Sequence, residues 1–235
     1  MIRAFWLITL MIAFNTQSAS LQVYVASSMY KPVKQVLEQM NIDAVLIQGS
    51  SAQLARQINQ GAPADLYISA HPTWAESVQQ RYDLPPQPPF VSNQLVVIGG
   101  KALSLHFAQM SLLELLSGEG GTLAIGDPSH VPAGMYTMEA VEALNIADRG
   151  QWIPARHVQH ALRFVEIGSV PLGVVFKTDA VHSDRVNILQ VIPAQYHSPI
   201  VYMSVALTEL GQQLQTALNQ DTSRQILNGY GFTPL

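Results

Sequence analysis

The stretch that decides the fold is Gly126-Asp127-Pro128-Ser129-His130-Val131-Pro132-Ala133-Gly134-Met135-Tyr136. The apolar run 122–125 before it predicts a buried strand, and its glycines and prolines favour a tight loop. After Gly134, apolar residues recur at helical spacing as far as Leu144. We therefore predict a strand, a loop and a helix N-terminus, where free amides and the helix dipole favour a bound anion. An ordinary connection without a ligand gives the same pattern, so both interpretations stay open at this point.

The rest of the chain alternates in the same way between apolar runs of strand length and segments of helical periodicity. Strands are predicted at 21–26, 44–47, 64–69, 95–98, 122–125, 171–176, 186–192 and 200–207. Helices are predicted near 32–40, 51–61, 72–82, 111–116, 135–144, 158–165, 208–219 and 222–228. This alternation predicts an α/β fold with largely parallel sheets, and two sheets of about five strands fit the length better than one.

The composition narrows the classes of partner. Charged residues make up only 12% of the chain, hydrophobic residues make up 48%, and the formal net charge is −4. A negative chain is a poor partner for nucleic acid or for an anionic membrane surface. A bound anion would therefore be held by local dipoles rather than by the net charge. The chain has no cysteine, which excludes disulfides, thiolate metal sites and cysteine nucleophiles.

The N-terminus has the pattern of an export signal. A basic start, Met1-Ile2-Arg3, precedes the apolar run 4–14, and small residues follow at Ser18-Ala19-Ser20. This pattern predicts a cleaved signal peptide over residues 1–20, because the apolar run is too short to span a membrane. We expect an exported protein in a bacterial periplasm, with a retained membrane anchor as the alternative.

The motifs of enzymes and metal sites are weak. The chain has no Gly-x-Ser-x-Gly nucleophile elbow. His157 and His160 are spaced to present two metal ligands from one helix, but no third ligand is near in sequence, so an ordinary structural role is favoured. We expect no enzyme. An exported hydrolase that uses His130 or His157 as its base remains the alternative from this class.

Small or polar residues directly precede four of the predicted helices. They are Ser28, Ser51, Ala133-Gly134 and His157-Val158. A serine in such a position normally caps its own helix. If the four helix ends meet across a cleft, their amides and hydroxyls form a cage of donors that suits a fully ionised tetrahedral oxyanion. The sequence alone does not show whether they meet.

These residues lie in segments that resemble the periplasmic molybdate-binding proteins of ABC importers, which are type II periplasmic binding proteins. The matching segments are 25–28, 50–58, 61–70, 126–128, 131–134, 171–175, 179–180 and 229–232. They follow one another in order through the whole mature chain. The Leu-Ala-Arg-Gln-Ile segment at 54–58 and the Val-Pro-Ala-Gly loop at 131–134 are the specific ones.

The resemblance implies a two-lobed fold in which each lobe is a mostly parallel sheet flanked by helices, with a hinge of two crossing strands. Lobe 1 would comprise residues 21–95 and 200–235, and lobe 2 residues 96–199. Such a protein captures molybdate or tungstate between its lobes and delivers the oxyanion to the membrane permease of an ABC importer. It would act as a monomer without a cofactor. A binding protein for another oxyanion, such as sulfate, is the alternative; a ferric site is disfavoured because the acidic residues are scattered.

The resemblance also implies a ligand shell of two serine hydroxyls, two helix amides and a tyrosine hydroxyl. Carried over position by position, it falls on Ser28, Ser51, Ala133, Val158 and, for the tyrosine, Phe176. Phenylalanine has no hydroxyl, so one donor is absent from its expected place. Tyr30 and Tyr136 are the candidates to replace it by their sequence position.

Overall fold

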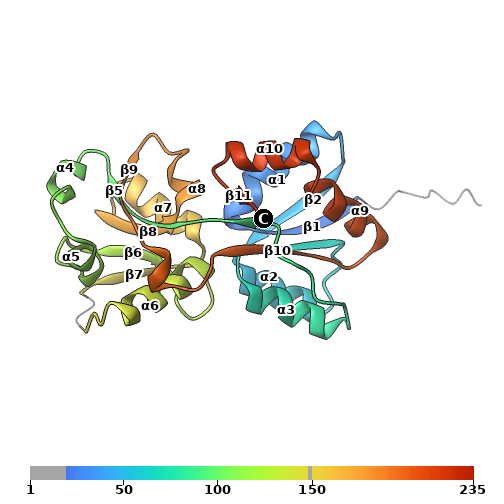
Figure 1. Cartoon of the computed structure of the whole chain (residues 1–235), viewed down its shortest axis with the longest axis horizontal. Coiled ribbons are helices and arrows are strands. Elements are labelled where there is room, and N and C mark those ends of the chain that lie inside the picture. The colour runs from blue at the N-terminus through green and yellow to red at the C-terminus, as the bar shows by residue number, and fades with distance from the viewer. Residues whose placement is uncertain (1–19, 148–149) are drawn as a thin grey trace, which may run out of the picture.

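A computed structural model describes residues 20–147 and 150–235 of the chain. Apart from Ser20, the predicted signal peptide lies outside these residues. No helix of the described part is both long and apolar enough to cross a membrane. The described chain forms two bodies that lie side by side, each built on one sheet with helices packed against it (Figure 1).

The first body contains a six-stranded sheet with the order β11-β4-β10-β3-β1-β2. Its strands are β1 (Leu21–Ala26), β2 (Ala44–Gly49), β3 (Leu66–Ser69), β4 (Val91–Ser92), β10 (Val201–Ala206) and β11 (Thr233–Pro234). Its helices are the 3₁₀ turn η1 (Ser27–Met29), α1 (Tyr30–Gln39), α2 (Ser51–Asn59), α3 (Pro72–Arg81), α9 (Glu209–Leu218) and α10 (Asp221–Gly229).

The second body contains a five-stranded sheet with the order β7-β6-β8-β5-β9. Its strands are β5 (Leu95–Gly100), β6 (Leu123–Gly126), β7 (Trp152–Ala155), β8 (Leu172–Phe176) and β9 (Val186–Val191). Its helices are α4 (Ser104–Phe107), α5 (Leu112–Ser117), α6 (Pro132–Ala143), α7 (Val158–Glu166) and α8 (Lys177–Ala180), and the 3₁₀ turn η2 (Ala194–Tyr196) follows β9.

The sheets are mixed, which refines the expectation of mostly parallel sheets. β1 pairs in parallel with β2 and β3, and β6 pairs in parallel with β7 and β8. Apart from the pairing of β4 with β11, the antiparallel pairs in the two sheets all include β10 or β5. These two strands are the first that the chain forms after it passes from one sheet to the other, so no βαβ crossover sets their direction. The predicted α/β class with two sheets is confirmed.

The chain passes between the two sheets twice. It leaves β4 and enters β5 through Asn93 and Gln94, and it returns from β9 to β10 through residues 192–200. The two connections run beside each other between the bodies (Figure 1). Both ends of the described chain therefore belong to the first body.

The first sheet is covered by helices on both faces. Val23 of β1 is fully buried in one hydrophobic cluster with Val33 and Val36 of α1. Its neighbour Tyr24 belongs to a second cluster with Leu54 of α2. Successive side chains of a strand point to opposite faces, so this alternation places α1 and α2 on opposite sides of the sheet, as Figure 1 shows.

The decisive stretch folds as a strand, a loop and a helix, but the helix begins earlier than predicted. α6 starts at Pro132, where a proline fits because the first turn of a helix needs no amide partner there. Gly134 lies inside the first turn rather than in the loop. A Cβ atom on Gly134 would lie 1.9 Å from the backbone oxygen of Gly126. Glycine is thus the residue that lets α6 dock directly against the end of β6.

Candidate functional site

The five predicted site residues line one small cavity between the two bodies. Ser28 and Ser51 reach it from the first body, and Ala133, Val158 and Phe176 reach it from the second. The cavity lies beyond the carboxyl ends of strands of both sheets, which is where open α/β sheets bind ligands. The cavity is small in this structure, about 10 Å³, which is roughly the space of one water molecule.

Ser51 does not cap its own helix. It is the first residue of α2, and the cap is Ser50, whose side chain accepts a hydrogen bond from the amide of Gln53 (3.3 Å). The Ser51 Oγ instead accepts a hydrogen bond from the amide of Ala70 (3.0 Å) and is 1% exposed. This contact uses one lone pair of the Ser51 oxygen and leaves its hydroxyl proton available to donate.

Ser28 is also not a cap. It lies in η1, directly after β1, and no side-chain cap is formed at the start of η1 or α1. Its Oγ lies 2.7 Å from the hydroxyl of Tyr202, a fully buried residue of β10. Tyr202 was not predicted as a site residue, because it sits in an apolar run and meets Ser28 only through the tertiary fold.

Two helix N-termini complete the cavity. Ala133 is the second residue of α6 and Val158 the first residue of α7. The first amides of a helix have no partner inside the helix, and no side chain within residues 20–147 and 150–235 caps either of these two ends. By contrast, α2, α3, α5 and α9 each begin with a side-chain cap. The two helix ends at the cavity therefore keep free donors and a positive end of the helix dipole.

Phe176 forms an apolar part of the cavity wall. It ends β8, is 1% exposed, and its ring contacts the rings of Tyr136 and Tyr202 at centroid distances of 6.4 and 6.0 Å. Tyr30 and Tyr136, the predicted replacements for the missing hydroxyl, are not among the residues that line the cavity. Tyr202 does not line the cavity either, but its phenol lies 2.7 Å from the hydroxyl of Ser28, which does.

His157 contributes no positive charge to the cavity at neutral pH. It precedes α7, lines the cavity, and its ring stacks on His160 at a centroid distance of 3.7 Å. Burial, with the neighbouring His160, lowers the pKa of His157 to about 4. No group of three potential metal-ligating side chains occurs in the described part of the chain. The two histidines are therefore better explained as packing around the cavity than as metal ligands.

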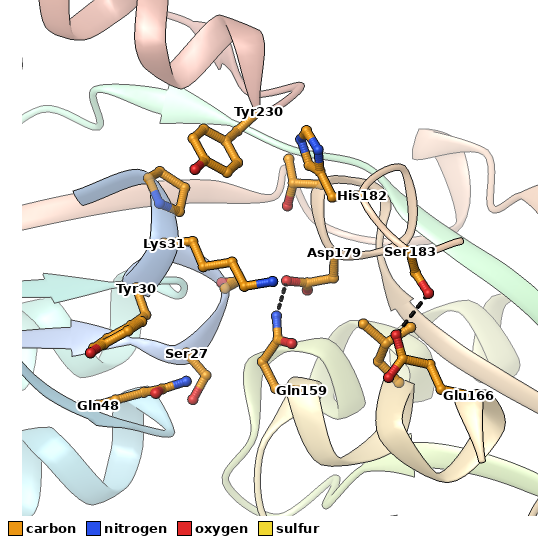
Figure 2. A pocket seen from close by; sticks show the side chains of 14 residues that line it. Ser27, Tyr30, Lys31, Gln48, Gln159, Glu166, Asp179, His182, Ser183 and Tyr230 are labelled. Atoms are coloured by element: carbon orange, nitrogen blue, oxygen red, sulfur yellow. Dashed lines mark hydrogen bonds between the residues drawn. The ribbon is translucent and has the colours of Figure 1, made fainter. Parts of the chain in front are cut away.

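A second, larger pocket of about 340 Å³ adjoins the cavity, and Ser27 and Ser28 line both. In Figure 2 the side chain of Lys31, on α1, points across this pocket toward Asp179, on α8 of the other body. The Oδ1 atom of Asp179 accepts a hydrogen bond from Gln159 (2.5 Å), whereas its Oδ2 atom has no partner in the part of the chain described. Burial raises the pKa of Asp179 to about 7, although the charge of Lys31 acts in the opposite direction.

The raised pKa of Asp179 predicts a pH-dependent stability. Between about pH 4 and pH 7 the folded protein binds more protons at this carboxyl than the unfolded chain does, so its contribution to stability is present at low pH and is lost as the pH rises. We expect Asp179→Asn to gain at least about 1 kcal/mol relative to the parent between pH 5 and pH 8, because one pKa unit corresponds to about 1.4 kcal/mol. Denaturant unfolding of both proteins at the two pH values measures this difference. Asp184→Asn, an exposed site in the same segment, serves as the control. Parallel pH profiles for Asp179→Asn and the parent would contradict the prediction.

Comparisons with known proteins agree with this architecture. Residues 21–233 match the family model described as bacterial extracellular solute-binding protein. The chain is 35% identical to the molybdate-binding protein ModA of Escherichia coli, over 90% of this chain and 88% of that protein. It is 32% identical to the molybdate-binding protein ModA of Haemophilus influenzae, over 92% and 91%.

The solved structures extend the comparison to the fold. The periplasmic molybdate-binding protein of Azotobacter vinelandii superimposes with a TM-score of 0.74 at 21% identity, over 91% of this chain and 99% of that chain. The two-lobed arrangement with two mixed sheets is thus shared with periplasmic binding proteins. From the family match over nearly the whole described chain and the identity to full-length relatives, we conclude that the chain belongs to the bacterial extracellular solute-binding proteins.

Proposed function

We propose that this protein captures molybdate or tungstate in the cavity between its two lobes and delivers the oxyanion to the membrane permease of an ABC importer. The relatives at 32 and 35% identity are molybdate-binding proteins, and this supports the choice of ligand. The export signal predicted in residues 1–20 and the extracellular family support a periplasmic location. The protein would act as a monomer, without a cofactor, without nucleic acid and without catalysis.

One observation carries the proposal: two serine hydroxyls and two uncapped helix ends converge on one cavity. The donors are the side chains of Ser28 and Ser51 and the amides of Ala133 and Val158. No Lys, Arg, Asp or Glu is among the described residues that line it. Neutral donors around a small cavity stabilise an ion that offers only acceptors, because the oxygens of the ion then find protons without a competing charge.

The lobe boundaries are part of the same proposal. Lobe 1 comprises residues 21–95 and 200–235, and lobe 2 residues 96–199. The course of the chain supports this division, because it passes between the sheets at residues 93–94 and 192–200. A ligand that contacts Ser28 and Ser51 on one side and Ala133 and Val158 on the other favours the closed arrangement of the lobes.

A thermal-shift panel tests the ligand. Molybdate and tungstate should raise the melting temperature of the protein, because a ligand bound only by the folded state adds to its stability. At a hundredfold excess over Kd the gain is about 2.7 kcal/mol, or roughly 5–10 °C for a protein of this size. Sulfate and phosphate should shift it far less, because a smaller ion does not reach all the donors, and each buried donor left unpaired costs about 1–3 kcal/mol.

The same panel decides between this proposal and its alternatives. A larger shift with sulfate would favour a sulfate-binding protein, and a shift with ferric citrate alone would point to a metal site. An exported hydrolase finds little support in the geometry. The serine nearest to His130 is the exposed Ser129, whose hydroxyl donates to the carboxylate of Asp127 (2.6 Å) rather than to the imidazole.

A further inference from the structure

His157 carries a buried ring nitrogen without a hydrogen-bond partner at the cavity. It directly precedes α7 and lines the cavity beside Val158, the first residue of that helix. Its Nδ1 atom is buried and has no partner among the residues that the structure describes. Several described side chains have such an atom, and His157 is the one among them that lines the cavity. A buried polar atom without a partner is unfavourable and needs an explanation.

Helix capping does not provide this explanation. His71 has the equivalent position before α3, also with an extended backbone, and its Nδ1 atom accepts a hydrogen bond from the amide of Thr73 (3.3 Å). The side chain of His157 makes no such bond to α7. The ring nitrogen and the first amides of α7 therefore both remain free at the cavity.

Packing explains the ring of His157 but not its nitrogen. The ring stacks on His160, with 3.7 Å between the centroids and a tilt of 37°. His160 is exposed and does not line the cavity. A phenyl ring at position 157 could make the same stacking contact, so the polar Nδ1 atom is the feature that packing leaves unused.

An oxyanion in the cavity would supply the missing partner. The four oxygens of a tetrahedral oxyanion can accept more hydrogen bonds than the two serine hydroxyls and two helix amides donate, and Phe176, in the same wall, offers no donor. A neutral imidazole donates from the nitrogen that carries its proton, so the tautomer protonated at Nδ1 can donate to the ligand without adding a charge.

We propose that the Nδ1 atom of His157 donates a hydrogen bond to the bound oxyanion and takes the place of the donor that Phe176 does not offer. This inference rests on the proposed oxyanion function and adds one residue to its ligand shell. It accounts for the unpartnered nitrogen, for the absence of a cap on α7 by this side chain, and for a wall residue without a polar atom at position 176.

His157→Phe tests the proposal, because it keeps a ring that can stack on His160 and removes the nitrogen. The Kd for molybdate, measured by calorimetry, should rise about tenfold or more, the size expected for one hydrogen bond to a charged group. The melting temperature without ligand should not fall, because a buried polar atom without a partner has been removed. His160→Phe is the matched control: it changes the other ring of the stack and should leave the Kd within about twofold of the parent.

Phe176→Tyr provides a second test, because it adds a hydroxyl to the same cavity wall. In the His157→Phe background this hydroxyl should recover most of the lost affinity. In the parent, where His157 already donates, it should change the Kd by less than about threefold. Equal gains in the two backgrounds would mean that the two residues do not replace each other, and would overturn the inference.

NMR on the parent protein with ¹⁵N-labelled histidine needs no variant to fold. In the molybdate complex, Nδ1 of His157 should carry a proton. An unprotonated Nδ1 in that complex, or a molybdate Kd of His157→Phe equal to that of the parent, overturns the inference and leaves the proposed function standing. A parent protein that binds neither molybdate nor tungstate overturns both.

Discussion

Replacing Gly134 with alanine is expected to lower the free energy of unfolding by about 3 kcal/mol or more, a large effect for one methyl group. The added Cβ would lie 1.9 Å from the backbone oxygen of Gly126. The course of the backbone fixes the positions of both atoms, so no rotation of a side chain can relieve the clash. The first turn of α6 would have to move off the end of β6 to make room. Ala133 is part of that turn, so any folded fraction should also bind molybdate more weakly. Urea unfolding and calorimetry on the same preparation measure both effects.

Gly229→Ala provides the comparison for Gly134. Gly229 ends α10, and a Cβ added there would have no atom within 4 Å. This substitution should leave the stability unchanged or raise it by about 0.4–1 kcal/mol, because alanine reduces the freedom of the unfolded chain. If both variants unfold at the same urea concentration, α6 is not docked on β6 as closely as the structure has it.

Removing the two serine hydroxyls is expected to cause the largest loss of ligand affinity. Each hydroxyl would donate to a dianion, so Ser28→Ala and Ser51→Ala should each cost about 1.5–3 kcal/mol of binding. That is roughly a tenfold to hundredfold increase in the Kd for molybdate, and the double variant should lose more affinity than either single variant. Calorimetry on the single and double variants measures these values.

A serine that acts only as a cap should behave differently. Ser111 caps α5 in a capping box with Glu114. Ser111→Ala should therefore lower the stability by about 0.5–2 kcal/mol and leave the molybdate Kd unchanged. The same pattern in Ser28→Ala or Ser51→Ala, with reduced stability and parental affinity, would show that the serine is structural and would remove it from the ligand shell.

Local patterns in the sequence carry much of this fold. The eight predicted strands all form, because each comes from a short apolar run of four to eight residues, the length that favours a strand over a helix. Three strands were not predicted. β4 and β11 have two residues each, too few for a period. β7 contains Pro154 and is half exposed at the edge of its sheet, where a proline is tolerated but the apolar signal is weak.

The site was predictable only in part, for a physical reason. Ser28, Ser51, Ala133 and Val158 stand at helix starts, and a helix start leaves a local signature. The sequence is equally consistent with serines that only cap their own helices. The contacts of Ser28 with Tyr202 and of Ser51 with Ala70 do not support that interpretation. The partners behind them leave no local signature.

Tyr202 shows why such partners escape sequence analysis. It lies 174 residues from Ser28 in the chain, inside an apolar strand where a tyrosine looks like an ordinary core residue. Asp179 similarly belongs to a four-residue helix, and its burial depends on how α1 of the first body faces it. Contacts of this kind are created by the packing of distant elements, so only a three-dimensional structure reveals them.

The place of β10 between β3 and β4 has a consequence for the order of folding during synthesis and export. The five-stranded sheet uses only residues 95–191, an unbroken segment, whereas the six-stranded sheet lacks a central strand until residues 201–206 have emerged. Until then, β4 has neither of its neighbours, and the edge of β3 that will pair with β10 stays open. During synthesis the N-terminus emerges first. The five-stranded sheet can nevertheless be completed first, and the six-stranded sheet, which contains the first strand of the chain, is completed last.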